Sequence, residues 1–212
     1  MKISEIQSLS PYYNLICITE THIDQTFFSS QLFNDTDKNI YRKDRNINGG
    51  GVLIAIDCEI PHMTILSCQE ETCEIIGINV KLKSLDLTVI CFYRPDKNID
   101  DMDPFYRYIN TIRIAHPKNK FLILGDFNMP DIDWQRKINF PSTPTIQNVF
   151  VSFLNDQNLE QLIKVPTHVK GNILDILCTD LGSLILDTEV ISPGLSDHFL
   201  VTARIVGKQV AG

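Results

Sequence analysis

The chain has 212 residues, of which 43% are hydrophobic and 21% charged, a size and composition that suit one globular domain and exclude a fibrous or disordered protein. Its formal net charge of −7 argues against a protein that coats nucleic acid by overall positive potential, but allows an enzyme that holds one phosphate through a metal ion. Because there is neither an apolar run of ~18 residues nor a secretory signal, we expect an intracellular protein, in nucleus or cytoplasm, without a membrane partner.

The first half of the chain predicts one short helix followed by strands. Ile3, Ile6 and Leu9 recur at a spacing of three residues and Pro11 follows them, which indicates a short amphipathic helix. Apolar runs then predict buried strands at residues 14–19, 52–56, 74–82 and 87–92. The last two of these strands are expected to form a hairpin across the polar KSLD segment.

The second half adds two helices and more strands. Asp103 is expected to cap a helix that begins at Pro104 and ends near His116, and Thr143-Pro144 repeats this signal. Apolar runs predict strands at residues 121–124, 173–178, 184–191 and 199–206. Strands outnumber helices, and pairs of strands alternate with single helices. This order favours a layered α/β sandwich with mixed sheets over a strictly alternating doubly wound fold.

Polar side chains lie at the ends of the apolar runs, or interrupt them. Such positions matter because rigid scaffolds usually present functional groups where buried strands end. The residues concerned are Glu20 after NLICIT, Asp126 and Asn128 after FLILG, Asp175 within ILDIL, and Asp197 and His198 before FLVTARI.

The GDFN segment combines two such residues. Asp126 and Asn128 are two positions apart, so in an extended chain both side chains point the same way. Gly125 allows a close backbone turn there. The alternative is that GDFN is only a turn, because Gly, Asp and Asn all favour turns.

Asp175 stands inside an apolar strand, where an ionised carboxylate is strongly disfavoured unless it is paired. His198 is the obvious partner. An Asp–His pair fixes the tautomer of the imidazole and raises its basicity, as phosphate-contacting and acid–base histidines require. The alternative is a structural aspartate that caps backbone N–H groups.

The ligands available for a metal are hard oxygens. Carboxylate and amide oxygens select Mg²⁺ or Mn²⁺ over zinc. None of the six cysteines forms a C-x-x-C pair, which also argues against a zinc site. The predicted oxygen donors are Glu20, Asp126, Asn128 and Asp197.

Five segments in order, ICITETH, CFYRP, LILGDFNMPDIDW, NILDIL and LSDHFLV, resemble the endonuclease/exonuclease/phosphatase superfamily, and within it the apurinic-type endonuclease domains of non-LTR retrotransposons. The resemblance implies a domain over residues 1–206 and a tail over residues 207–212. It also implies a four-layer α/β sandwich, with two mixed β-sheets packed face to face and helices outside. The implied activity is metal-dependent hydrolysis of DNA phosphodiesters by water, which leaves a 3′-hydroxyl and a 5′-phosphate.

The resemblance assigns metal and water to one group of residues. Glu20 would be the principal ligand of Mg²⁺ or Mn²⁺, with Asp197 nearby. Asp126 would activate or orient the attacking water, and Asn128 would help to hold the water and the phosphate. Which side chain serves as the base stays open.

The phosphate is assigned to another group. His198, oriented by Asp175, would bind a phosphate oxygen, and Tyr93 would donate its hydroxyl to the same phosphate. Alternatively, Tyr93 simply ends its strand. Arg42, Arg45 and Lys170 are candidates for contacts with the DNA backbone, and a solvated charged loop is the alternative for each region. The five segments that carry the resemblance do not themselves assign these contacts to Arg42, Arg45 and Lys170.

The sequence departs from the family at its start. The family begins with a central strand that ends in an asparagine, whereas here Met1 opens directly into the helix and Asn14 is wrongly placed for that role. We therefore expect one strand to be missing, weaker metal binding and slower cleavage. The alternatives are an impaired remnant or nucleic-acid-binding module, and a phosphatase or phosphodiesterase acting on inositol phosphates or lipids. A full-length element would also contain a reverse transcriptase domain, which is absent here.

Overall fold

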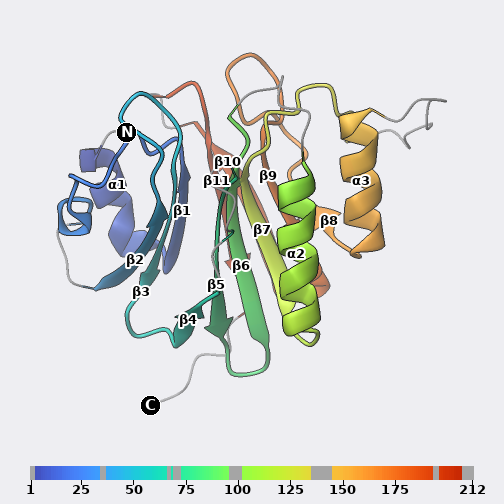
Figure 1. Cartoon of the computed structure of the whole chain (residues 1–212), viewed down its shortest axis with the longest axis horizontal. Coiled ribbons are helices and arrows are strands. Elements are labelled where there is room, and N and C mark those ends of the chain that lie inside the picture. Colours follow the sequence, from blue (N-terminus) through green and yellow to red (C-terminus); the bar gives the residue numbers. More distant parts are fainter. Residues whose placement is uncertain are drawn as a thin grey trace.

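A six-stranded mixed sheet forms the centre of the computed structural model, which describes residues 3–33, 37–65, 68, 73–95, 102–134, 145–192 and 196–206 (Figure 1). Its strand order is β4-β5-β6-β7-β9-β8, and only β6 and β7 pair in parallel. The strands are β4 His62–Thr64, β5 Glu74–Lys81, β6 Asp86–Tyr93, β7 Lys120–Asp126, β8 Glu160–Gln161 and β9 Asp175–Thr179.

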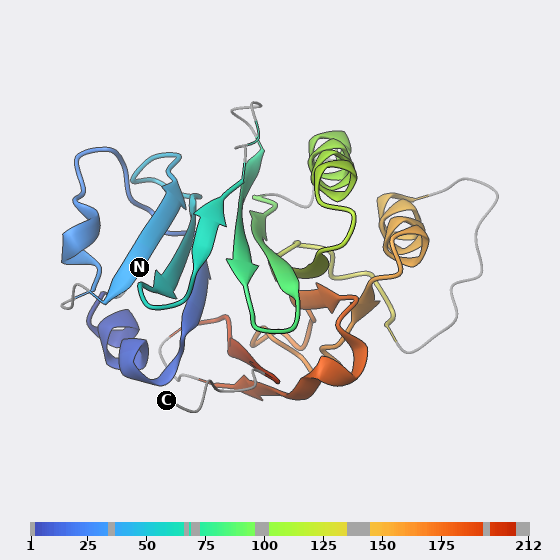
Figure 2. The ribbon, with the colours of Figure 1, turned by 90° about the horizontal axis from the view of Figure 1, so that it is seen from below.

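Two helices, α2 (Asp103–Ala115) and α3 (Ile146–Asp156), cover one face of this sheet (Figures 1 and 2). The apolar side of each helix packs on alternate residues of β6 and β7, so that Phe105 of α2 and Phe150 of α3 share a core with Phe92 and Phe121. Because the other face is covered as well, the central strands β5 and β6 are almost wholly buried, and their sequences read as nearly continuous apolar runs.

The other face carries a second layer of strands. One part is an antiparallel sheet in the order β1-β3-β2, and the other is the antiparallel pair β10-β11. Both parts pack on the same core, which Ile54 and Val201 enter from the second layer and Val89 enters from the central sheet. The strands are β1 Leu15–Thr19, β2 Lys38–Lys43, β3 Val52–Asp57, β10 Ile185–Ile191 and β11 Leu200–Ile205.

The outermost layer on this side is the short helix α1 (Ile3–Leu9), followed by a 3₁₀ turn at Ser10–Tyr12. Ile6 packs with Ile16 and Ile18 in a third apolar cluster behind the three-stranded sheet. Two further 3₁₀ turns lie at Ser29–Gln31 and Gly182–Leu184. The layered α/β sandwich expected from the sequence is therefore confirmed.

The second layer differs in detail from the expected mixed sheet. It is antiparallel throughout the described residues, and it is divided between β1 and β11, which are not hydrogen-bonded neighbours. None of the described helices has the length and apolar character needed to span a bilayer.

Several element boundaries differ from those predicted. Asp103 is the first residue of α2, and Met102 occupies the cap position without a capping side chain. Thr145 caps α3 by accepting a hydrogen bond from the Asn148 N–H, whereas the predicted cap at Thr143-Pro144 and the predicted tail at 207–212 lie outside the described residues. β2, β4 and β8 were not predicted, because they are short or polar.

The strand register brings the polar strand ends to one edge of the sandwich. Tyr93 is opposite Asp126 in the parallel pair, and Asp126 is opposite Asp175 in the antiparallel pair. Asp175 is thus the first residue of β9, not its middle. Gly125 makes the close pairing possible, because its φ of +141° is unfavourable for other residues and a Cβ there would overlap the Phe92 carbonyl oxygen.

Candidate active site

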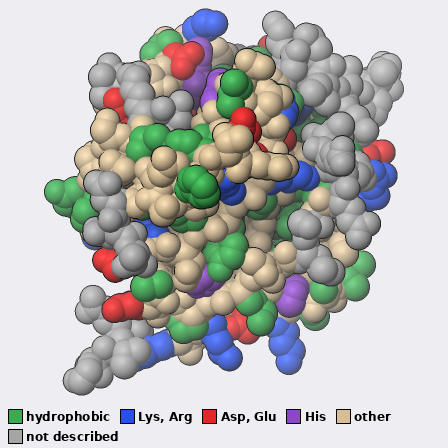
Figure 3. All heavy atoms as spheres, turned by 60° about the vertical axis from the view of Figure 1, so that its left-hand side comes forward, with side chains coloured by type: hydrophobic (Ala, Val, Ile, Leu, Met, Phe, Trp, Pro, Cys, Tyr) green, Lys and Arg blue, Asp and Glu red, His purple; other side chains and the backbone are tan. Residues whose placement is uncertain are grey.

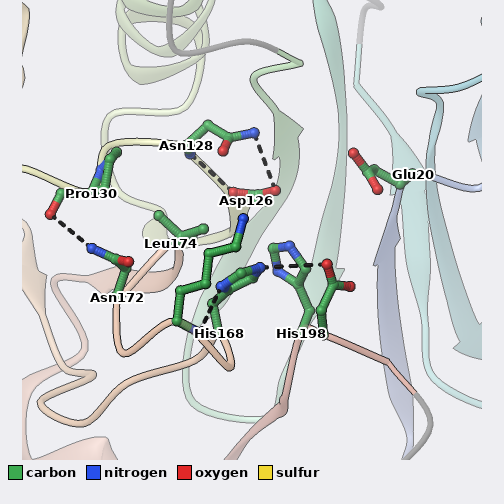
Figure 4. A pocket seen from close by; sticks show the side chains of 10 residues that line it. Glu20, Asp126, Asn128, Pro130, His168, Asn172, Leu174 and His198 are labelled. Atoms are coloured by element: carbon green, nitrogen blue, oxygen red, sulfur yellow. Dashed lines mark hydrogen bonds and ion pairs between the residues drawn. The ribbon is translucent and has the colours of Figure 1, made fainter.

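A pocket of about 350 Å³ opens at this edge of the sandwich (Figure 4). In the space-filling view, acidic and histidine side chains lie together at the upper end of the molecule (Figure 3). Six of the residues predicted for the site line the pocket, and Asp175 stands behind one of them, His198. The lining residues are Glu20, Asp126, Asn128, Pro130, His168, Lys170, Asn172, Leu174, Asp197 and His198.

Asp126 is the most buried acid of the pocket, with 2% of its surface exposed. Its Oδ1 accepts the Asn128 N–H at 2.9 Å. Burial, and after it the neighbouring Asp175 carboxylate, raise the pKa of Asp126 to about 7, against the opposing effect of His198. The carboxyl group can therefore exchange a proton near neutral pH, which a general base must do.

Asn128 is held from both sides by Arg94. Its Nδ2 donates to the Arg94 carbonyl oxygen at 2.9 Å, and the Arg94 Nη1 donates to the Asn128 carbonyl oxygen at 2.9 Å. Arg94 itself is 3% exposed. These reciprocal bonds fix the turn after β7, in which Asn128 adopts a φ of +48°. The GDFN segment is thus both a turn and a wall of the pocket.

Asp175 and His198 form the pair expected from the sequence. The distance between His198 Nδ1 and Asp175 Oδ2 is 2.8 Å. This hydrogen bond and the charge of Asp175 raise the pKa of His198 to about 9, against the opposing effect of burial. His198 is therefore an imidazolium at neutral pH, with its second nitrogen available to an anion.

Glu20 lines the pocket from the end of β1, on the opposite side from Pro130 and Asn172 (Figure 4). It accepts a hydrogen bond from the Tyr93 hydroxyl, which is otherwise buried. Burial and this bond to Glu20 both raise the pKa of Tyr93. Here the hydroxyl contacts Glu20, whereas the resemblance assigned it to a phosphate.

Asp197 precedes β11 and is the most exposed acid of the pocket, with 68% of its side chain accessible. Its carboxylate lies 3.4 Å from His168 Nε2. Asp197 and His198 do not open a strand, as the sequence suggested, but lie in the loop before it.

Acidic and histidine side chains around the pocket form groups that could hold a metal ion. In the described part of the chain, the Asp126 carboxylate accepts hydrogen bonds only from Asn128, although it is buried beside a second carboxylate. An acid so placed is stabilised by a cation. Asp126, Asp175 and His198 offer ligand atoms within 4.8 Å of one another, and so do His168, Asp197 and His198. Glu20 belongs to neither group, although it lines the same pocket.

The three cations predicted to bind substrate are placed differently. Lys170 lines the pocket. Arg42 does not, because its side chain is 15% exposed and pairs with Asp44 at 3.1 Å. Arg45 pairs with Glu74 at 2.9 Å and donates to the Gly49 carbonyl oxygen, beside the glycine run. The structure thus brings one of the three to the pocket.

Sequence reasoning also missed residues that shape the site. These residues are His168, Asn172 and Leu174. Their position becomes clear only from the antiparallel bridge between His168 and His198, which joins segments 30 positions apart. A histidine in the loop before the strand that carries Asp175 was the one available signal.

We expect Asp175→Asn to lower the pKa of His198 from about 9 to its ordinary value near 6.5 or below. The hydrogen bond to the carboxylate is the largest cause of the raised value, and burial alone would lower it. NMR titration of the imidazole resonances measures this change, with His62, at β4, as the internal reference. An unchanged titration of His198 would show that Asp175 does not set its charge.

The comparisons with known proteins agree with this geometry. The sequence profile described as endonuclease–reverse transcriptase matches residues 87–202. The endonuclease domain of TRAS1, a telomere-specific non-LTR retrotransposon, superposes with a TM-score of 0.73 at 15% identity, covering 99% of this chain and 94% of that one. No curated protein sequence matches significantly.

Two other solved structures share the fold at lower similarity. The 3′ phosphatase NExo from Neisseria, bound to a product DNA hairpin, has a TM-score of 0.65 at 16% identity and covers 97% of this chain and 94% of that one. An AP endonuclease from Archaeoglobus fulgidus has a TM-score of 0.60 at 16% identity, with 97% and 93% covered. Because the profile matches more than half of its length, the chain belongs to the endonuclease–reverse transcriptase family and has the endonuclease/exonuclease/phosphatase fold.

Proposed function

We propose that this chain is a divalent-metal-dependent endonuclease that hydrolyses phosphodiester bonds of DNA, as the nuclease part of a retrotransposon-type element. The observation that carries the proposal is the convergence of the buried Asp126 and the Asp175–His198 pair on one acidic pocket. Family membership supports nuclease chemistry, and the DNA hairpin bound to the Neisseria neighbour supports a nucleic-acid substrate for this fold. We place its action inside the cell, in nucleus or cytoplasm, where an element's DNA target lies.

Each group has a role that its environment suits. Asp126, with a pKa near 7, takes a proton from the attacking water. His198 donates from its second ring nitrogen to a phosphate oxygen and stabilises the charge that develops there. The P–O3′ bond then breaks, and the leaving oxygen takes up a proton to become the 3′-hydroxyl. Asn128 orients the water, and Lys170 contributes positive charge at the pocket wall.

Glu20 and Asp197 would hold the ion, and Mg²⁺ or Mn²⁺ is the choice that their oxygen atoms favour. The bound ion would supply Lewis-acid stabilisation of the phosphoryl oxygens. His198 is not counted among the ligands, because its Nδ1 is bonded to Asp175 and its pKa is about 9.

We expect the protein to convert supercoiled plasmid to the open-circular form in Mg²⁺ or Mn²⁺, and not in excess EDTA. The nicks should support primer extension by a polymerase without prior treatment, because they carry a 3′-hydroxyl. Release of phosphate from inositol phosphates, with the plasmid left intact, would instead indicate a phosphatase of the same fold. Plasmid retardation on a gel without nicking would indicate a binding module.

A further inference from the structure

His168 is a buried side chain on the wall of the pocket, with 6% of its surface exposed. It lies in the segment between β8 and β9, and its backbone forms an antiparallel bridge with His198. The bridge consists of two backbone hydrogen bonds, from Val169 N–H to the Asp197 carbonyl oxygen at 2.9 Å and from Phe199 N–H to the Thr167 carbonyl oxygen at 2.7 Å. His168 is thus fixed beside the Asp197–His198 loop.

The hydrogen bonds of His168 determine where its proton lies. Its Nδ1 is 3.1 Å from the Lys170 N–H, which can only donate, so Nδ1 carries a lone pair. The neutral ring then carries its proton on Nε2, and that nitrogen faces Asp197 Oδ2 at 3.4 Å. An Nε2 with a proton is a donor to the carboxylate and not a metal ligand. The grouping of His168 with Asp197 and His198 is therefore better explained by hydrogen bonding than by a second metal site.

The same ring also supports His198. The two imidazoles meet edge to face, with centroids 4.8 Å apart and an interplanar angle of 77°. Thr167, the preceding residue, accepts the N–H groups of Leu174 and Asp175 on its Oγ1, each at 3.0 Å. One short segment therefore connects Asp175 to its partner His198.

We propose that His168 is a positioning residue, which holds the Asp197 carboxylate through Nε2–H and keeps His198 in place by ring packing. This inference rests on the proposed function, in which Asp197 holds the ion. The side chain of Asp197 is 68% exposed, and its Oδ1 accepts only a long hydrogen bond of 3.5 Å from the Ser196 hydroxyl, so the contact with the buried His168 restricts its rotamers further. A buried donor that orients a ligating carboxylate strengthens metal binding, and the loss of such a partner typically costs about 10- to 100-fold in affinity or activity.

The test compares His168→Phe with His168→Gln. Phenylalanine keeps an aromatic ring against His198 but has no donor for Asp197, whereas the glutamine Nε2 lies as many bonds from Cα as the histidine Nε2 and can donate. We expect the dissociation constant for Mn²⁺, measured by electron paramagnetic resonance titration of the protein without DNA, to rise about 10-fold or more in His168→Phe. In His168→Gln it should stay within about 3-fold of the parent value.

His62→Phe is the matched control, since His62 lies on β4 at the other end of the sandwich and bonds Tyr41 and Ile60 (Figure 1). Thermal unfolding of each variant separates lost positioning from lost folding. Equal Mn²⁺ affinity in the parent, His168→Phe and His168→Gln would overturn the inference, and so would equal weakening in both variants. A parent that binds Mn²⁺ but nicks no DNA would contradict the proposed function, and the ratio between the two variants would still decide the role of His168.

Discussion

Asp126→Asn is expected to reduce plasmid nicking by about 10³-fold, within the range that a general base contributes. Asparagine has the same shape and can still accept the Asn128 N–H on its side-chain oxygen, so the turn after β7 should persist. It has no group that takes a proton from water. The rate of open-circle formation at saturating Mg²⁺ measures the loss.

The same substitution is expected to stabilise the metal-free fold at alkaline pH. Burial raises the pKa of Asp126 from 3.8 to about 7, so between these values the folded state binds a proton that the unfolded chain releases. Stability is therefore lost as pH rises through this window, and above about pH 7 the full cost is present. At about 1.4 kcal/mol for each pKa unit, this shift corresponds to a cost on the order of 4 kcal/mol. Asparagine avoids it.

Thermal unfolding in EDTA at pH 8 and at pH 4 checks this stability effect. Asp126→Asn should unfold several degrees above the parent at pH 8, and the gap should narrow at pH 4. Asp131→Asn, an exposed change in the same loop, should alter neither nicking nor stability. An Asp126→Asn protein that is less stable than the parent at pH 8 would contradict the assignment of a destabilising, functional carboxylate.

The sequence was sufficient to predict the buried strands and the Asp175–His198 side of the site. A single local rule, that a carboxylate inside an apolar strand needs a partner, led from Asp175 to His198, and the structure places the two atoms 2.8 Å apart. The buried strands could be recognised because strands covered on both faces are apolar throughout.

The remaining features depend on contacts that local patterns do not encode. β2 has the polar sequence KNIYRK and forms a strand because β3 supplies its hydrogen-bonding partner. Arg42 looked like a free cation in a charged loop, yet its guanidinium is directed to Asp44 and to the Asp24 carbonyl oxygen. His168 reaches the pocket through a single backbone bridge to His198. Each of these results follows from pairing across the chain, so spacing along the sequence carries no signal for it.

The Asp175–His198 pair leads to a further prediction. The losses of nicking rate caused by substituting Asp175 and His198 separately should not add when both are substituted. His198→Ala should lower nicking by about 10²- to 10³-fold at every pH, because a charged donor to the phosphate is removed. Asp175→Asn keeps the His198 imidazole as the donor, but without the carboxylate the imidazole loses its charge at a lower pH. Its loss should therefore be small at pH 6 and grow toward that of His198→Ala at pH 8, since in the parent the histidine stays charged up to about pH 9.

The double variant should be no slower than His198→Ala alone, because Asp175 acts through the imidazole and has nothing to orient once the ring is gone. Nicking rates of the four proteins at pH 6 and pH 8, with Mg²⁺ saturating for each, complete the cycle. Additive losses would mean that Asp175 works independently of His198, for example as a direct ligand of the ion. The pH dependence distinguishes the two roles, because a missing ligand would lower the rate at pH 6 as strongly as at pH 8.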